Sequence, residues 1–205
     1  MDDNLVIALF RHGITQENKR KAYLGWSDSP LSKEESLSIR PIKQSYDLYF
    51  SSDLERCIHT TKLLFPNENA ICLSEFREMN FGKWEKKTYE QLKDRREYQR
   101  WLTDPFSQSP PDGELFSNFQ CRVQSGWNKI LNRMFDSNCS SAAVVTHGGV
   151  IRLLLSELSP VQKAFWEWTV SHGIGFELIF EKEALRRGER CTLLQEVPIT
   201  AKEHG

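Results

Sequence analysis

Two histidines and two arginines are the chain's most promising chemical groups, because each lies at or just beyond the end of a predicted buried strand. These residues are Arg11, His12, Arg56 and His147. In open α/β sheets, ligands bind at the carboxyl ends of the strands, and the backbone N–H groups at a helix start attract anions. Guanidinium groups bind phosphate oxygens in pairs. If the four side chains converge on one rim, they predict a site for a phosphate dianion.

Taken one at a time, the same residues have simpler interpretations. A histidine after a strand is most often a hydrogen-bonded structural residue, and an arginine in the first turn of a helix is usually solvated. Four such residues at three strand ends are harder to explain in that way. The coincidence therefore favours the phosphate site.

The strands that would position these residues are visible as apolar runs of the kind that is buried on both faces of a sheet. The runs cover residues 5–10, 48–50 and 142–146. After the second run, Ser52 and Glu55 have the spacing of a capping box, in which Ser52 caps a helix and Glu55 reaches back to the cap. This helix should end near Leu64, before Pro66.

The rest of the chain is expected to complete a sheet covered by helices. A helix is predicted over 150–158, and the runs 176–180 and 191–197 predict an antiparallel hairpin around a polar turn at 186–188. The loop Ser171-His172-Gly173 before the hairpin would contribute at most backbone groups near the phosphate. Because strands and helices alternate, the sequence indicates an α/β fold.

Residues 84–135 differ from the rest because many aromatic side chains lie on charged, helix-forming stretches. The aromatic residues are Trp84, Tyr89, Tyr98, Trp101, Phe106, Phe116, Phe119 and Trp127. We interpret the segment as a helical insertion lying over the sheet. Aromatic side chains dominate protein cores, so packing explains them as well as a pocket for a planar substrate does. Both interpretations stay open.

Composition argues against several classes of protein. The chain has 205 residues and a net charge of −1, which suits one domain over 1–205 and argues against a nucleic-acid binder. No apolar run approaches the ~20 residues that span a bilayer. The five cysteines form no C-x-x-C pair, which disfavours a disulfide scaffold or zinc ribbon. The start is acidic, unlike that of a leader peptide, so we expect a cytoplasmic protein with reduced thiols.

Five segments between about residues 5 and 155 carry motif patterns. They are Arg11-His12-Gly13-Ile14-Thr15-Gln16-Glu17-Asn18, Ser51-Ser52-Asp53-Leu54-Glu55-Arg56-Cys57, Glu75-Phe76-Arg77-Glu78-Met79-Asn80-Phe81-Gly82-Lys83-Trp84-Glu85, Pro111-Asp112-Gly113-Glu114 and Val145-Thr146-His147-Gly148-Gly149. In this order they resemble the R-H-G-x-T-x-x-N, S-S-D-L-x-R-A, L-x-E-x-x-F-G-x-W-E, P-x-G-E and V-x-H-G-G motifs of the histidine phosphatase superfamily, the phosphoglycerate mutase-like proteins.

The resemblance implies a fold and a branch of the family. The implied fold is a three-layer α/β/α domain with a mostly parallel central sheet, an antiparallel edge strand and a helical lid, which would be the insertion at 84–135. The chain looks like the phosphatase branch, which includes α-ribazole-phosphate phosphatases and broad-specificity enzymes. The expected partner is a small phosphorylated molecule, with no nucleic acid or membrane, for a monomer or homodimer.

The resemblance also implies roles for named residues in a phosphomonoester hydrolase that uses neither a metal nor a cofactor. His12 would take the phosphoryl group, and it must be neutral to attack. Its neighbours Arg11 and Arg56 should lower its pKa. Glu78 would protonate the leaving alcohol and then activate the water. The residues implied to hold the phosphoryl oxygens are Arg11, Asn18, Arg56, His147 and Gly148.

The chain departs from the family pattern outside the phosphate-binding set. Lys86 stands where a glycine is usual after Trp-Glu, and Cys57 stands where alanine is common. Lys33-Glu34-Glu35 replaces the end of an L-T-x-x-G pattern, and the helix after it looks short. These departures concern substrate specificity and leave the chemistry intact.

Three other functions were weighed. A cofactor-dependent phosphoglycerate mutase would resemble E-R-H-Y-G at the acid, but Met79 and Asn80 replace its cationic pair. A non-catalytic phosphate-binding module would typically have lost the nucleophile or the acid, and both are present. A zinc site from His12, His147 and Glu78 lacks an H-E-x-x-H motif, and the arginines would repel the cation. The motifs of serine hydrolases, P-loops and dinucleotide-binding folds are absent.

Overall fold

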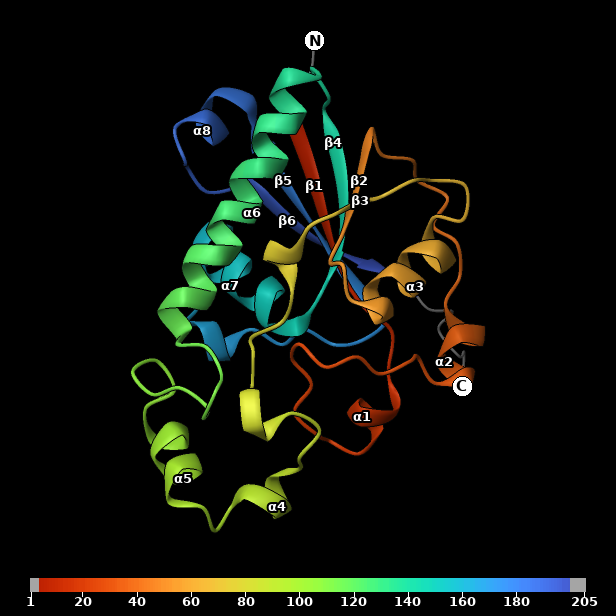
Figure 1. Ribbon diagram of the computed structural model, residues 1–205. Coiled ribbons are helices and arrows are strands. Elements are labelled where there is room, and N and C mark those ends of the chain that lie inside the picture. Colours follow the sequence, from red (N-terminus) through yellow and green to blue (C-terminus); the bar gives the residue numbers. More distant parts are fainter. Residues whose placement is uncertain (1–3, 200–205) are drawn as a thin grey trace.

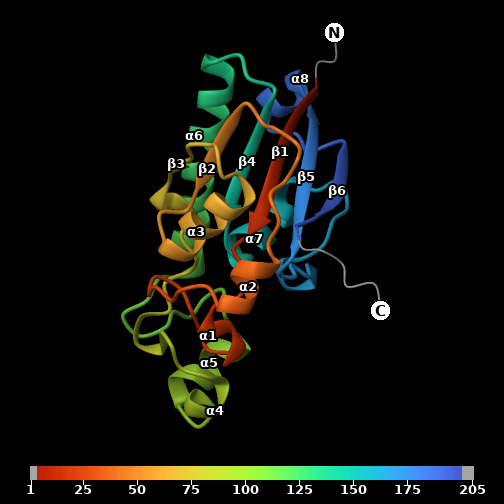
Figure 2. The same cartoon turned by 90° about the vertical axis from the view of Figure 1, so that its right-hand side faces the viewer.

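The computed structural model describes residues 4–199, and a six-stranded sheet forms the centre of the molecule (Figures 1 and 2). The strands are β1 (Asn4–Arg11), β2 (Leu48–Ser51), β3 (Ile71–Cys72), β4 (Ser141–Thr146), β5 (Ile174–Glu181) and β6 (Leu193–Pro198). Their order in the sheet is β3-β2-β4-β1-β5-β6. The first four in that order are parallel, and β5 is antiparallel to both β1 and β6.

Helices cover both faces of this sheet, so the predicted α/β class with a mostly parallel sheet is confirmed. The antiparallel strand β5 lies between β1 and β6, one place in from the edge. The helices are α1 (Gln16–Lys19), α2 (Lys33–Ser38), α3 (Glu55–Leu64), α4 (Tyr89–Leu92), α5 (Arg96–Thr103), α6 (Phe116–Asp136), α7 (Gly148–Leu158) and α8 (Lys182–Arg186), with 3₁₀ turns at Ser74–Phe76, Gly82–Trp84 and Phe165–Glu167. Within 4–199, none of them combines the length and apolarity needed to cross a membrane.

Strand β1 shows how the two layers of core arise. Its side chains alternate between the faces of the sheet, with period 2. Leu5, Ile7 and Leu9 pack into the core that includes α6 and α7. Ala8 and Phe10 pack into the opposite core, against the side of α3. Burial on both faces explains the unbroken apolar run. Because β1 lies between β4 and β5, its end lies at the centre of the sheet's carboxyl edge.

The predicted capping box at Ser52 is wrong. Helix α3 begins at Glu55 with Leu54 as its N-cap, and no side chain caps it. The reason is that Ser52, the residue directly after β2, is still hydrogen-bonded to β4, since its N–H donates to the carbonyl of Val145 at 2.9 Å. The predicted end of the helix at Leu64 is confirmed.

Residues 84–135 do not form one insertion over the sheet. Helix α6 is a layer of the main core, and its buried apolar side chains recur every three or four residues, as on one face of a helix. They are Phe119, Val123, Trp127, Ile130 and Met134. Of the helices in this segment, α4 and α5 stand away from the sheet, beyond its carboxyl edge (Figure 1). A separate cluster holds them together, formed by Trp84, Leu92, Tyr98 and Trp101.

The hairpin at the C-terminal side is confirmed as antiparallel, with two differences in detail. The short helix α8, whose Ala184 and Leu185 are buried, precedes the predicted polar turn and ends at its first residue, Arg186. Gly188 follows it with a φ of 74°. Strand β6 begins at Leu193, because the N–H of Cys191 is bonded to the Leu158 carbonyl at the end of α7 and is not paired with β5.

Lys86, which stands where the family pattern has glycine, adopts a φ of 60°. This left-handed conformation costs a non-glycine residue about 1–2 kcal/mol, part of which glycine returns through its greater freedom when unfolded. We expect Lys86→Gly to stabilise the protein by about 0.5–1 kcal/mol and to raise Tm by roughly 1–4 °C. The side chain is exposed, so Lys86→Ala serves as the control, and an equal rise in Tm for both variants would contradict the explanation.

Candidate active site

The two His-Gly motifs lie side by side because β1 and β4 are neighbours. Arg11 pairs with Thr146 at the ends of these parallel strands. The next N–H, that of His12, donates to the Thr146 carbonyl at 2.9 Å. The imidazole rings of His12 and His147 are consequently 5.1 Å apart between centroids, edge to face. Both residues are buried, as a site formed by converging strand ends requires.

The imidazole of His12 is oriented and held neutral. Its Nδ1 is 2.8 Å from the carbonyl oxygen of Gly13. Because a carbonyl only accepts, Nδ1 carries the hydrogen, and Nε2 has the free electron pair. The pKa of His12 lies well below its usual value, chiefly because of burial and then because of Arg56 and Arg11. The sequence analysis named only the arginines, and burial is the larger cause.

The guanidinium of Arg56 is fully buried beside the histidines. It donates to the carbonyls of Gly25 at 2.5 Å and Ser27 at 2.8 Å, and it lies 3.6 Å from the carboxylate of Asp28. Arg11 donates to the Val170 carbonyl at 2.5 Å. These backbone contacts fix the two cations in place from opposite sides.

Each guanidinium also has a buried N–H that is not yet used. Within residues 4–199, Nε of Arg11 and Nε of Arg56 have no hydrogen-bond partner. Burial lowers the pKa of Arg11 to about 10, so its side chain is still a cation at neutral pH. Buried N–H groups without partners are rare in proteins. Two of them on adjacent cations are suited to an oxyanion. Over the same residues, no group of three or more His, Cys, Asp or Glu side chains is arranged to hold a metal ion.

The side chain of Glu78 contacts the N-terminal turn of α7, next to the second His-Gly motif. Its Oε2 accepts the N–H of Gly149 at 2.9 Å, and its Oε1 accepts the N–H of Met79 at 2.9 Å. A Cβ at position 149 would lie 2.2 Å from Oε1 of Glu78, so a larger residue there would displace the carboxylate from its present position. At position 148, a Cβ would lie 3.2 Å from Cζ of Arg11, which places that N-terminal turn against the cation.

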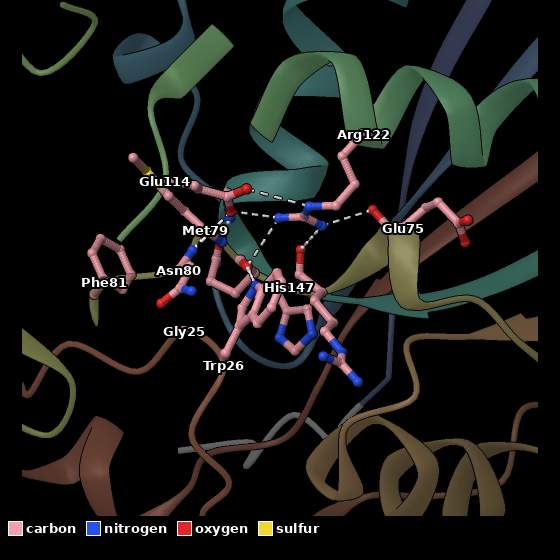
Figure 3. A network of polar contacts seen from close by, with 12 residues as sticks. Gly25, Trp26, Glu75, Met79, Asn80, Phe81, Glu114, Arg122 and His147 are labelled. Atoms are coloured by element: carbon pink, nitrogen blue, oxygen red, sulfur yellow. Dashed lines mark hydrogen bonds and ion pairs between the residues drawn. The ribbon is translucent and has the colours of Figure 1, made fainter. Parts of the chain in front are cut away.

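The segment that carries Glu78 is fixed by Arg122 of α6 (Figure 3). The Arg122 guanidinium donates to the carbonyls of Glu75, Arg77 and Glu78. It also pairs with the Glu114 carboxylate at 2.5 Å, and Glu114 accepts the N–H of Asn80 at 2.8 Å. Sequence reasoning missed Arg122. The available signal was a cation within the apolar stripe of a core helix.

Asn18 was expected to donate to the phosphoryl group. Its Oδ1 accepts the N–H of Thr15 at 3.1 Å and completes the cap of α1. The side chain is half-buried and lines a hollow together with Arg11 and His172. The cap consumes the oxygen and leaves the amide N–H groups for a ligand, so its contact with a phosphoryl oxygen stays a prediction.

His172 brings a third imidazole to the site, where only a backbone contribution was expected. Its Nδ1–H donates to the carbonyl of His12 at 2.9 Å, and the two rings are 5.6 Å apart between centroids. Burial, followed by the charge of Arg11, lowers the pKa of His172 to about 4. Its lone position before Gly173 gave no signal that the ring faces the site.

Three neutral histidines, of which His12 and His147 are buried and His172 is half-buried, predict a stability that falls in acid. The pKa values of His12, His147 and His172 in the folded protein lie below the unfolded value of 6.5. The unfolded chain therefore binds more protons, and stability present above about pH 6.5 is lost as pH falls toward the folded pKa values. Each histidine contributes up to about 1.4 kcal/mol per pH unit in that window.

Urea unfolding between pH 7.5 and pH 5 measures how steeply the free energy of unfolding falls with pH. We expect His172→Asn to make this slope less steep, by up to the contribution of one titrating histidine, because asparagine carries no titrating group. The amide of asparagine can still donate to the His12 carbonyl, so the contact itself is kept. His59→Asn is the matched control, since His59 is exposed on α3. A slope unchanged in His172→Asn would contradict the prediction.

A cavity of about 670 Å³ opens beside Glu78 and Gly149. Its walls are mainly aromatic, formed by Phe81, Trp101, Phe106, Phe116, Phe119 and Trp166. A second hollow, of about 550 Å³, lies on the side of Arg11, Asn18 and His172 and is more polar. Tyr23 and Leu102 line both. Some of the aromatic residues thus pack in the core, as Phe119 does, and also line a pocket.

The family model of the histidine phosphatase superfamily (branch 1) matches residues 7–183. An adenosylcobalamin/α-ribazole phosphatase of Salmonella typhimurium is 31% identical over 176 residues, covering 80% of this chain and 85% of the relative. A 2,3-bisphosphoglycerate-dependent phosphoglycerate mutase of Cytophaga hutchinsonii is 25% identical, covering 76% and 78%. The crystal structure of the α-ribazole phosphatase from Shigella flexneri has the same fold, with a TM-score of 0.80 at 24% identity over 98% of both chains.

Proposed function

Because the chain belongs to the histidine phosphatase superfamily, we propose that it hydrolyses a small organic phosphomonoester through a phosphohistidine on His12. One observation carries the proposal. The neutral His12 presents an unprotonated Nε2 next to two buried guanidinium groups, each of which has a buried N–H without a partner. That arrangement supplies a nucleophile and an oxyanion site together.

In the first step, Nε2 of His12 attacks phosphorus, and the bond from phosphorus to the ester oxygen breaks. The negatively charged phosphoryl oxygens stay paired with the guanidinium groups of Arg11 and Arg56 throughout. Phosphoryl transfer requires mainly such positioning and electrostatic stabilisation. Glu78 gives its proton to the departing oxygen. In the second step, Glu78 takes a proton from water, which attacks phosphorus, and the bond to Nε2 breaks, so His12 returns neutral.

The position of Glu78 sets the orientation of the substrate. A general acid must lie within hydrogen-bond distance of the leaving oxygen, so the organic part of the ester extends on the side of Glu78. That side is the aromatic cavity. We therefore propose an alcohol with a planar apolar ring as the leaving group. α-Ribazole 5′-phosphate, named for the relatives, carries a planar benzimidazole and is the first substrate to test.

Phosphate release from a panel of monoesters, with a chelator present throughout, tests the proposed function. The panel holds α-ribazole 5′-phosphate, p-nitrophenyl phosphate, ribose 5-phosphate and 3-phosphoglycerate. We expect turnover to survive chelation, because the positive charge at the site comes from arginine side chains. The ring-bearing esters should have the highest kcat/KM. Failure to release phosphate from any member, or a loss on chelation that zinc or magnesium restores, would contradict the proposal.

A further inference from the structure

The proposed mechanism does not explain how His147 is prepared for its role. Its ring is completely buried, and it is the N-cap of α7. Nε2 lies 3.0 Å from Oγ of Ser52. Among residues 4–199, Nδ1 has only the sulfur of Cys57 within hydrogen-bonding range, at 3.8 Å. Nδ1 is therefore the ring nitrogen that can meet a phosphoryl oxygen.

The identity of the atom that carries the hydrogen decides whether His147 attracts or repels that oxygen. A neutral imidazole has one N–H, and its other nitrogen presents a lone pair. The pKa of His147 is held well below its usual value by burial, followed by the charges of Arg56, His12 and Arg11. The ring is thus neutral, and only one tautomer places an N–H on Nδ1.

Ser52 has the geometry to select that tautomer. Its Oγ accepts the N–H of Leu54 at 3.5 Å, and its backbone N–H is held by Val145 in the sheet. The hydroxyl hydrogen is then available to Nε2 of His147, which accepts it with a lone pair when the ring hydrogen is on Nδ1. Ser52 is completely buried, so water does not compete for this contact.

Cys57 is the other group that touches the ring, with its sulfur 3.4 Å from Nε2. Burial raises the pKa of the Cys57 thiol, so it stays protonated and offers no thiolate to accept a hydrogen from Nε2. A thiol is also a weak donor compared with a hydroxyl. The serine therefore dominates the environment of Nε2.

We propose that Ser52 is a positioning residue that fixes His147 in the Nδ1–H tautomer and so makes it a hydrogen-bond donor to the phosphoryl group. The catalytic part of this inference rests on the proposed function, whereas the tautomer is a property of the free protein. The S-S-D-L-x-R segment would then contribute a tautomer-setting hydroxyl through Ser52, in addition to the cation Arg56.

¹⁵N NMR of the histidine rings in the free protein at neutral pH tests the tautomer without any turnover. We expect His147 of the wild type to carry its hydrogen on Nδ1. In Ser52→Ala the hydrogen should move wholly or partly to Nε2, and in Cys57→Ala it should stay on Nδ1. A wild-type His147 protonated on Nε2 would overturn the proposal, and so would an Nδ1–H tautomer that is unchanged in Ser52→Ala.

The kinetic consequence is measured by single-turnover labelling of His12 with p-nitrophenyl phosphate. Loss of one preorganised donor to an oxyanion typically lowers a rate by 10²–10³-fold. We expect Ser52→Ala to slow labelling by at least about tenfold and to weaken inhibition by orthovanadate, and Cys57→Ala to stay within about threefold of wild type. Equal rates for the two variants would overturn the role of Ser52. Absence of any labelled intermediate in the wild type would instead reject the proposed function, and the NMR result would still decide the tautomer.

Discussion

Replacing His12 with alanine should abolish the covalent intermediate and lower kcat by at least about 10³-fold. Nε2 of His12 is the only nucleophile that the proposed mechanism uses, and enzymes that lose a covalent route typically lose several orders of magnitude in rate. Acid-labile radioactivity from a phosphorylated substrate measures the intermediate, and phosphate release measures turnover. Both should vanish together.

His59→Ala is the matched control for this variant. His59 is exposed on α3, whereas His12 is 4% exposed. Labelling and turnover of the control should equal those of the wild type. Turnover above about 1% of wild type in His12→Ala, or acid-labile label that persists there, would assign the nucleophile to another residue. The other imidazoles nearby, those of His147 and His172, are the first that would then have to be tested.

The apolar runs predicted the centre of the fold because burial on both faces leaves a plain signal. β1 and β4 are such strands, and their parallel pairing carries Arg11, His12 and His147 to one edge. The predicted convergence of the two histidines therefore needed only the strand positions and the general rule on ligand sites in parallel sheets. Arg56 followed from its place just after β2, in the first turn of α3.

Long-range contacts set what the sequence did not predict. Ser52 has the spacing of a helix cap, but pairing with Val145 keeps it in the sheet, where it contacts His147 instead. Arg122 binds three carbonyls from a segment more than forty residues away in the sequence, and the cation within the apolar stripe of α6 indicates a buried role without identifying these partners. The apolar residues of α6 recur every three or four positions in the sequence, and this helical periodicity would have distinguished α6, as a core helix, from α4 and α5.

The arrangement of charges also explains why the site is built from buried backbone contacts. Burying two guanidinium groups is unfavourable unless hydrogen bonds satisfy them. Carbonyls of residues 25, 27 and 170 do so in part, and the carboxylate of Asp28 lies close to Arg56. The N–H groups that stay without partners are then presented to a bound anion in a fixed geometry. Such preorganisation is what stabilises charge in a transition state.

Glu78→Gln should slow the phosphorylation of His12 by about 10²–10³-fold for alkyl esters and by less than about tenfold for p-nitrophenyl phosphate. An alkoxide needs a proton to leave, whereas p-nitrophenolate leaves without one, and a general acid typically contributes 10²–10⁴-fold. Glutamine keeps the shape of the side chain and an oxygen that can accept the N–H of Gly149. The measurement is the single-turnover rate of labelling for each ester.

Glu75→Gln is the control, because Glu75 pairs with Lys129 on the surface and lies outside the aromatic cavity. Its rates should match the wild type for both esters. Equal losses for alkyl and aryl esters in Glu78→Gln would remove Glu78 from the role of acid.

The same assays separate hydrolysis from isomerisation. Met79 is buried and Asn80 spends its N–H on Glu114, so neither supplies the cation that a mutase has at these two positions. Interconversion of 2- and 3-phosphoglycerate faster than phosphate release would therefore overturn the phosphatase proposal in favour of a mutase.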